Sequence, residues 1–325
     1  MSARVPALAV VTVTADRYAT VRRTLRHLRE QTVSDRIEIL LVGPHADSFA
    51  ELTAAEVAGF AGCQTLVAGP IQEVERAFAL GVQAARAPVV ALLENHVYPE
   101  PTWAAAILRA HEGPWVAVGS IIGNANPASA TSWVEHFLTY AFDDVTAAGG
   151  EVPRVARNNT TFKRAALLEF GRQLPDALAR DGGMLEELTR RGYRFYREPT
   201  ARMVHLNPSR LAPMLRLRVL SARAFAATRA RTGQWSPVRR LVYALASPVF
   251  PLLRLRALWP HLRRHPQRHV FVRIAPLFAI ALALDALGQA LGFALGAGES
   301  AVRAGLYDLD RLPHLSPADH ARFAE

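Results

Sequence analysis

The stretch Pro88-Val89-Val90-Ala91-Leu92-Leu93-Glu94-Asn95-His96 decides the interpretation of this chain. Its first six residues carry no polar side chain and are too few for a helix, so they predict a strand buried on both faces of a sheet. Glu94 and His96 follow at the carboxyl end of that strand, where open α/β sheets bind ligands. A carboxylate and an imidazole there can hold Mg²⁺ or Mn²⁺ against a diphosphate. The alternative is a strand end that merely exposes a Glu and a His.

Length and composition allow one large α/β domain with an appendage, or two domains. The chain has 325 residues, and half of them are hydrophobic. Its single cysteine, Cys63, excludes a disulfide framework and suits a reducing cytoplasm, where we expect it to be a core residue. The apolar residues 1–14 indicate a first strand rather than a signal peptide, so no export is predicted.

The net charge of +10 is unevenly distributed along the chain. Residues 199–284 contain fifteen arginines and no Asp or Glu, which leaves the remainder of the chain at −5. This asymmetry points to an anionic surface, either nucleic acid or lipid head groups. The arginines are Arg202, Arg210, Arg216, Arg218, Arg223, Arg229, Arg231, Arg239, Arg240, Arg254, Arg256, Arg263, Arg264, Arg268 and Arg273.

Strands and helices alternate through the first two hundred residues, which predicts a doubly wound, mostly parallel sheet with right-handed crossovers. We expect residues 143–153 to form a mobile loop because they contain two adjacent glycines. The expected strands span 7–14, 37–42, 65–67, 88–93, 115–122, 193–198 and 201–205, and the expected helices span 18–31, 50–58, 72–85, 101–111, 131–142, 164–170 and 181–191.

The pattern changes after residue 207, where helices over 211–231 and 239–258 mix apolar residues with unpaired arginines. A third helical run, 274–295, is almost wholly apolar, and its glycines permit close helix packing. Unpaired arginines beside apolar helices favour contact with an anionic membrane surface, and a buried helical subdomain is the alternative. We therefore divide the chain into domains at 1–207 and 208–300 and a tail, 301–325, and we expect its polar residues 309–325 to be loose.

The amino-terminal part resembles family 2 glycosyltransferases with the GT-A fold, of the membrane-associated bacterial type. The likeness covers Leu8–His205 and begins with the strand and polar turn Val10–Arg17, a helix ending at Gln31 and a second buried strand, Glu38–Val42. Leu92–His96 occupies the place of the family's D-x-D motif, with Glu94 for the first Asp and His96 for the last. The resemblance implies a divalent cation held by Glu94, His96 and a late histidine, His205.

The resemblance also implies a catalytic base and a donor site. Asp181 matches the family's catalytic Asp, although Arg180 precedes it in place of Glu; Glu186 and Glu187 on the same helix are alternatives. The implied donor-binding residues are Thr14, Asp16, Arg17, Asn95, Asn158, Asn159 and Lys163. A helix cap with a solvated basic pair is the competing explanation for the last three of these.

These expectations describe an inverting, metal-dependent glycosyltransferase at the cytoplasmic face of the membrane, active in making cell-envelope polysaccharide. It would move a sugar from a nucleotide-sugar donor to a saccharide or lipid-linked acceptor. One alternative is a non-catalytic, membrane-attached scaffold on the same fold. Another is a nucleotidyltransferase, which would need a glycine-rich loop where this chain has Ala15-Asp16-Arg17-Tyr18. Nucleic acid is not an expected partner, because a long apolar run accompanies the arginines.

Overall fold

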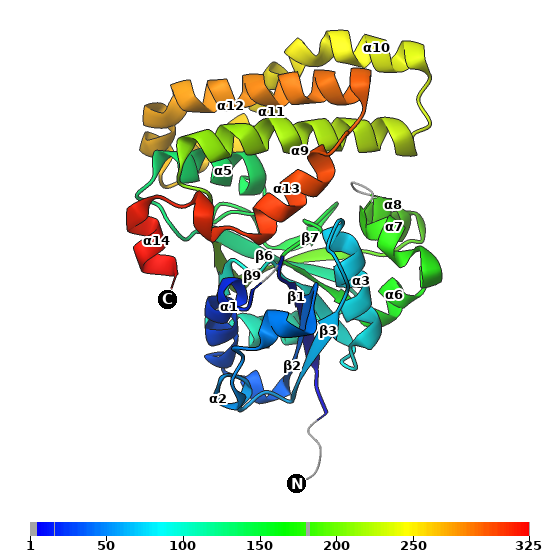
Figure 1. Cartoon of the computed structure of the whole chain (residues 1–325), viewed down its shortest axis with the longest axis vertical. Helices are drawn as coiled ribbons and strands as arrows, with labels where there is room; N and C mark the ends of the chain where they lie inside the picture. The colour runs from blue at the N-terminus through cyan, green and yellow to red at the C-terminus, as the bar shows by residue number, and fades with distance from the viewer. Residues whose placement is uncertain (1–4, 16, 180–182, 325) are drawn as a thin grey trace. The chain divides into compact units, whose positions relative to one another are not determined.

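The computed structural model describes residues 5–15, 17–179 and 183–324 (Figure 1). The chain forms two compact units. The first comprises residues 1–123, 147–205 and 323–325, and the second comprises residues 124–146 and 206–322. The later boundary lies within two residues of the expected one at 207, but the sequence did not indicate that residues 124–146 belong with the second unit.

The first unit is built on a mixed sheet with strand order β3-β2-β1-β4-β8-β6-β9-β5, and β7 pairs with β9. Four parallel strands form one half: β3 (Gly62–Val67), β2 (Ile37–Gly43), β1 (Leu8–Val13) and β4 (Val89–Leu92). All residues of β1, β2 and β4 are buried, as expected for the centre of a parallel sheet.

The other half of the sheet contains antiparallel pairs. Strand β8 (Thr160–Lys163) pairs antiparallel with both β4 and β6 (Ala117–Asn124). Strand β9 (Phe195–His205) pairs antiparallel with β5 (Val97–Pro99) and β7 (Gly150–Val152). Two expectations were wrong here: the two short strands are one strand that continues through Pro199, and the loop over 143–153 contains β7.

The helices of the first unit bury apolar faces against this sheet. In α1 (Ala19–Arg29) the buried residues Val21, Thr24, Leu25 and Leu28 recur at helical spacing. Helix α3 (Val74–Ala84) approaches β1 so closely that a Cβ on Gly81 would lie 2.2 Å from Val11 Cγ1. The helix expected over 50–58 is a 3₁₀ turn (Ala46–Phe49) followed by the short α2 (Ala54–Val57). The others are α4 (Trp103–Ala110), α6 (Arg164–Leu168), α7 (Leu174–Ala179) and α8 (Gly183–Arg190).

A buried carboxylate holds the turn that leads into β4. Glu38 on β2 is 1% exposed, and its Oε1 accepts the backbone N–H groups of Arg86 and Ala87, each at 2.6 Å. Its Oε2 accepts the Arg86 guanidinium at 3.1 Å. Because each carboxylate oxygen is hydrogen-bonded, this carboxylate is tolerated inside the sheet, and it fixes the start of the strand that leads to Glu94.

The second unit is helical. Figure 1 shows α9 (Leu211–Thr232) and α12 (Arg268–Leu295) running side by side, with α11 (Phe250–Arg264) and α10 (Pro237–Ala246) also against α12. Its main core joins α5 (Ala130–Tyr140) to α9, α11 and α12 through residues such as Trp133, Phe137, Met214, Leu258 and Phe278. The tail begins with α13 (Ser300–Leu309). The part expected to be loose, 309–325, instead contains a 3₁₀ turn (Leu312–His314) and α14 (Pro317–Phe323), and its residues Leu309 and Leu315 are buried.

A buried ion network explains the acidic residue that interrupts the apolar run of α12. Arg218 on α9 donates to both carboxylate oxygens of Asp285, at 2.8 and 2.6 Å, and to Glu135 on α5 at 3.1 Å. A bidentate pair of this kind fixes the register of the helices that it joins. By length and composition alone, 237–264 and 268–295 are each long and apolar enough to cross a membrane.

Candidate metal and donor site

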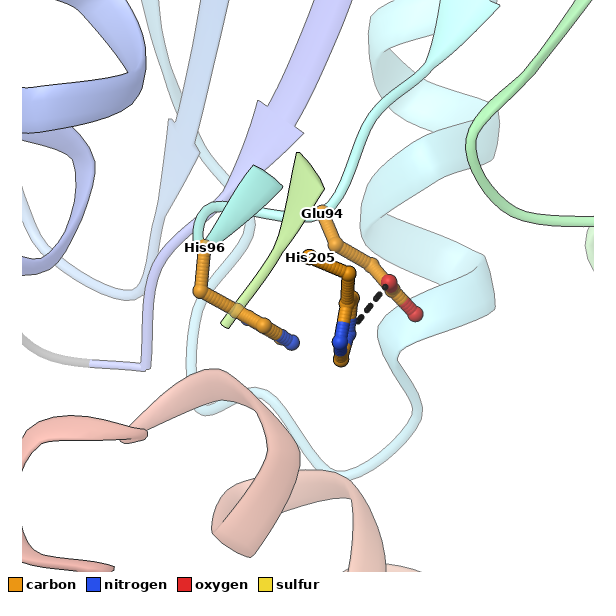
Figure 2. Close-up of side chains that lie close together, drawn as sticks. All are labelled: Glu94, His96 and His205. Carbon is orange, nitrogen blue, oxygen red and sulfur yellow. Dashed lines mark ion pairs between the residues drawn. The ribbon is translucent and has the colours of Figure 1, made fainter. Parts of the chain in front are cut away.

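Three strand ends of the first unit bring the predicted metal ligands together (Figure 2). Glu94 lies two residues beyond the end of β4, His96 directly precedes β5, and His205 is the last residue of β9. The antiparallel pairing of β5 with β9 places Val97 opposite His205, so the two histidines become neighbours. This sheet register, and not sequence proximity, assembles the group.

The three side chains form a compact and largely buried cluster. His205 Nε2 lies 3.3 Å from Glu94 Oε2, and the exposed fractions of these two side chains are 5% and 11%. The rings of His96 and His205 meet edge to face, with centroids 4.6 Å apart. One potential ligand atom from each residue lies within 4.8 Å of the other two, so a small cation could contact all three after a modest contraction.

Two asparagines hold the carboxylate of Glu94. Asn158 Nδ2 donates to Oε1 at 2.9 Å, and Asn159 Nδ2 donates to Oε2 at 2.6 Å. Asn159 Oδ1 accepts the backbone N–H of Glu94 at 3.1 Å. Asn159 adopts a left-handed conformation with φ of 58°, which asparagine tolerates better than most residues. Both asparagines precede β8, whose first residue pairs with the last residue of β4.

The environment keeps Glu94 ionised. Burial by itself raises the pKa of a carboxyl group, but hydrogen bonding and charge from His205 outweigh it, with help from His96 and Asn158. The pKa of Glu94 therefore lies well below its usual range. An ionised carboxylate is the form that binds a metal ion.

Hydrogen bonds also set the tautomer of His96. Asn95 Nδ2 donates to Thr20 Oγ1 at 3.2 Å, which orients the amide so that its Oδ1 faces His96 Nδ1 at 2.8 Å. An amide oxygen can only accept, so Nδ1 carries a proton, and in the neutral ring Nε2 has the lone pair. Metal-binding histidines usually have their second ring nitrogen fixed in this way. The donor set of one carboxylate and two imidazoles therefore fits a divalent cation such as Mn²⁺.

Two threonines that the sequence analysis did not identify support this arrangement. Thr20 orients Asn95, and the hydroxyl of Thr24 contacts the backbone carbonyls of Asn95 and Val97 at 2.8 and 3.0 Å. Thr24 is fully buried on a helix whose other buried residues are aliphatic. In the sequence, the signal that could have identified Thr24 is a hydroxyl residue at a position where the helical spacing calls for an apolar one.

Among the predicted donor-binding residues near β1, Thr14 shapes the turn that follows the strand. Its hydroxyl donates to the Arg17 carbonyl at 2.8 Å and lies 2.9 Å from the hydroxyl of Thr20. Arg17 itself is exposed. Asp16, also predicted to bind the donor, lies outside the described residues.

Lys163 is not brought to the cluster. It is the last residue of β8 and pairs with Val89, at the end of β4 opposite Glu94, and its Nζ donates to the Gly113 carbonyl at 2.8 Å. The adjacent Arg164 donates to the carbonyls of Val82 and Gln83, each at 2.9 Å. The sequence placed Lys163 with Asn158 and Asn159 because they are close along the chain, but an extended strand separates them in space.

The predicted catalytic base, Asp181, lies outside the described residues, whereas its two alternatives are placed on α8. Glu186 and Glu187 line a surface pocket of about 350 Å³ together with Phe170, Gln173 and Arg191. Glu187 is ion-paired with Arg190 at 2.7 Å and with Arg191 at 2.8 Å. Their hydrogen bonds lower the pKa of Glu187 to about 2, so it is a poor proton acceptor.

A second group of potential ligands lies in the second unit but is less suited to a metal. His136, Asp144 and His265 are all buried, and Asp144 Oδ2 lies 3.6 Å from His265 Nε2. The backbone N–H of Gln267 donates to His265 Nδ1 at 3.0 Å. The neutral ring therefore carries its proton at Nε2, facing Asp144, where a metal would need a lone pair.

Comparisons with known proteins establish the fold. No protein-family model and no curated protein matches the chain. The mannosyltransferase PcManGT from Pyrobaculum calidifontis, solved in complex with GDP-Man and Mn²⁺, superposes with a TM-score of 0.51 at 15% identity and covers 94% of this chain and 88% of its own. GalNAc-T7, solved with UDP, GalNAc and Mn²⁺, is more distant, with a TM-score of 0.45, 13% identity and coverage of 62% and 43%. The predicted GT-A-like fold, followed by long helices, is confirmed.

Proposed function

We propose that the protein is a metal-dependent glycosyltransferase that moves a sugar from a nucleoside-diphosphate sugar to an acceptor hydroxyl. The observation that carries the proposal is the cluster of Glu94, His96 and His205, with an ionised carboxylate and a set tautomer, at the strand ends of a GT-A fold. Carboxyl ends of strands are the usual ligand sites of open α/β sheets. The similar mannosyltransferase was solved with a nucleotide sugar and Mn²⁺, which agrees with this function.

Each residue near the cluster has a distinct task in this proposal. Glu94, His96 and His205 would hold Mg²⁺ or Mn²⁺, which when bound offsets negative charge on the departing nucleoside diphosphate. Asn158 and Asn159 keep the carboxylate of Glu94 in place. Asn95 orients His96, because both ends of its amide are engaged, so we reassign it from donor binding to positioning.

The acceptor side of the reaction needs a general base. We propose Asp181 in an inverting reaction, in which the acceptor oxygen attacks the anomeric carbon from the face opposite the leaving diphosphate and its proton passes to the carboxylate. Glu186 is the preferred alternative, because the two arginines occupy the carboxylate of Glu187. Asp181→Asn should remove transfer and leave donor binding near normal.

The composition and the exposed surface of the second unit favour an acceptor that is bound to a membrane. Fourteen of the fifteen arginines of residues 199–284 lie in this unit, that stretch contains no Asp or Glu, and the helices of the unit expose many large apolar side chains. We infer that it associates with an anionic membrane surface at the cytoplasmic face, with a saccharide or lipid-linked acceptor destined for cell-envelope polysaccharide.

Donor hydrolysis tests the proposed chemistry. The full-length protein would be assayed for nucleoside diphosphate release from UDP-, GDP- and dTDP-sugars, with Mn²⁺, Mg²⁺ or EDTA. We expect slow release from one donor, lost with EDTA and in Glu94→Gln, and retained in the exposed control Glu112→Gln. Absence of both release and donor binding would favour the non-catalytic scaffold. Pyrophosphate release from a nucleoside triphosphate and a sugar phosphate would favour a nucleotidyltransferase.

A further inference from the structure

An apolar stripe faces outward along α10, the 3₁₀ turn that follows it (Ser247–Val249) and the start of α11. It consists of Val238, Leu241, Val242, Leu245, Val249, Leu252 and Leu253, which fall at positions i, i+3, i+4, i+7, i+11, i+14 and i+15. This spacing lies on one side of a helix and normally faces a protein core. Here every member is more than half exposed, with Val238 at 72%, Leu245 at 74% and Leu252 at 69%. We call these seven residues the outward apolar face.

The arginines of α10 turn in the other direction. Arg240 Nε donates to the carbonyl of Phe293 on α12 at 3.0 Å, and the guanidinium of Arg239 lies 4.2 Å from the ring centroid of Trp235. Helix α10, all of which is described, contains no buried residue. Both arginines therefore contact the protein, although Arg239 is also exposed, while the aliphatic side chains face outward; a helix that packs in water normally buries its aliphatic side.

The charge around this face selects among possible occupants. Arg256, Arg263, Arg264, Arg268 and Arg273 on α11 and α12 are exposed. No Asp or Glu occurs between residues 199 and 284 to balance them. An aliphatic stripe followed along the chain by exposed guanidinium groups complements an anionic lipid leaflet. The acyl chains would receive the aliphatic side chains, and the head groups would receive the guanidinium groups.

The packing of α12 bears on whether this helix crosses the bilayer. Gly288 and Gly292 bring α12 against α9 so closely that an added Cβ would lie 2.5 Å from the Val219 carbonyl oxygen and 2.3 Å from that of Arg223. The two helices therefore share one orientation relative to the membrane, and if α12 crosses the bilayer, α9 must enter it as well.

Helix α9 is unsuited to the membrane interior. It exposes Arg216, Arg229 and Arg231, and the centre of the α9–α12 pair contains the ion network of Arg218 with Asp285. A spanning α12 would carry these charges into hydrocarbon, where arginine and carboxylate groups are strongly disfavoured. Part of the apolar surface of α12 packs within the unit, where Ile274, Phe278 and Leu282 join the main core.

We propose that the second unit lies in a single leaflet of an anionic membrane, with the outward apolar face inserted among the acyl chains and with α12 not crossing the bilayer. This inference rests on the membrane association proposed above and is independent of glycosyl transfer. The two tests measure binding to lipid vesicles and the side of the membrane on which residues are accessible. Neither depends on enzymatic activity, so a negative result is distinct from a failure of the proposed glycosyl transfer.

Vesicle flotation tests the inserted face. The protein would be floated at low salt with two kinds of vesicle, phosphatidylcholine alone and phosphatidylcholine with about 30% phosphatidylglycerol. The second kind has a negatively charged surface. We expect binding to the anionic vesicles, and a loss of about tenfold or more in affinity for Leu245→Glu/Leu252→Glu. The matched control is Val67→Glu, at a residue of β3 that is 57% exposed, and it should bind like the wild type. Circular dichroism would confirm that both variants fold.

Wild-type binding by the double variant would overturn the proposed face. Failure of the wild type to float while it binds duplex DNA at the same salt would overturn the lipid occupant in favour of nucleic acid.

Sided labelling tests the single-leaflet placement. Cys63 is the only cysteine of the chain, so Cys63→Ser provides a background for single cysteines. These would be placed at Gln267, just before α12, and at Glu299, just after it, both of which are exposed. In inside-out and right-side-out membrane vesicles, a membrane-impermeant maleimide should label both positions from the cytoplasmic side only. Labelling of the two positions from opposite sides would show that α12 spans the bilayer and would overturn the proposal.

Discussion

The hydrogen bonds behind His96 predict that a residue outside the ligand set controls metal affinity. Replacing Asn95 by leucine keeps a similar volume but removes the oxygen that accepts the Nδ1 proton of His96 at 2.8 Å. Without this acceptor the ring can place its proton on Nε2, where it competes with a cation. Asn95 is 1% exposed, so water cannot readily replace the lost contact.

The size of the effect follows from the lost contact. Leaving a buried donor unsatisfied costs about 1–3 kcal/mol. Since a factor of ten in affinity corresponds to about 1.4 kcal/mol, Asn95→Leu should weaken Mn²⁺ binding about 10- to 100-fold, the usual range for a group that orients a metal ligand. The conservative variant Asn95→Asp retains an acceptor oxygen and should bind Mn²⁺ at least as well as the wild type.

The assay is a titration of the full-length protein with Mn²⁺, in which electron paramagnetic resonance reports the free ion without need of substrate. Thermal unfolding of each variant separates a loss of ligand geometry from a loss of fold. Wild-type affinity in Asn95→Leu, with binding abolished in Glu94→Gln, would refute the role of the tautomer. Wild-type affinity in Glu94→Gln would refute the metal site itself.

Three other predictions concern stability and reactivity. Burial lowers the pKa of His111 to about 3, so below pH about 6.5 the unfolded chain binds a proton at this histidine that the folded protein does not. The free energy of unfolding should therefore fall by up to about 1.4 kcal/mol per pH unit as the pH decreases toward 3. Urea titrations should show a shallower dependence of stability on pH in His111→Phe. Gly292→Ala places a methyl group 2.3 Å from the Arg223 carbonyl oxygen and should destabilise the second unit by about 1–3 kcal/mol in thermal melts, whereas Leu287→Ala, at a half-exposed site on the same helix, should have little effect. Burial raises the pKa of the Cys63 thiol to about 11, so iodoacetamide at pH 8 should alkylate the native protein at least about tenfold more slowly than the unfolded chain, and equal rates would contradict this environment.

The strand that carries the site was predictable because its signal is local. Apolar residues 88–93 must be covered on both faces, and strands alternating with helices over the first two hundred residues leave few topologies other than an α/β sheet. Glu94 and His96 could be placed at a strand end for the same reason. The inverted amphipathicity of α10 was not predictable, because periodicity shows that a helix has an apolar side but not what that side faces.

Long-range pairing explains the other differences. Strand β9 continues through Pro199, and α5 joins the second unit because Trp133 and Phe137 pack with residues from α9, α11 and α12. The helices that pack against Trp133 and Phe137 lie more than seventy residues later in the sequence. Local propensity is weak where tertiary contacts decide, so two short strands and an independent helix were equally consistent with the residues alone.

The amino-acid sequence by itself determined the class of the fold, the metal-capable residues beyond β4 and the basic, apolar character of the carboxyl-terminal helices. These properties follow from patterns within a few residues, because side-chain periodicity and strand length are local. Only the tertiary structure placed His205 and Asn159 on Glu94, separated Lys163 from them and set the tautomer of His96. These outcomes depend on strand register, and a shift of one residue would turn the same side chains to the opposite face of the sheet.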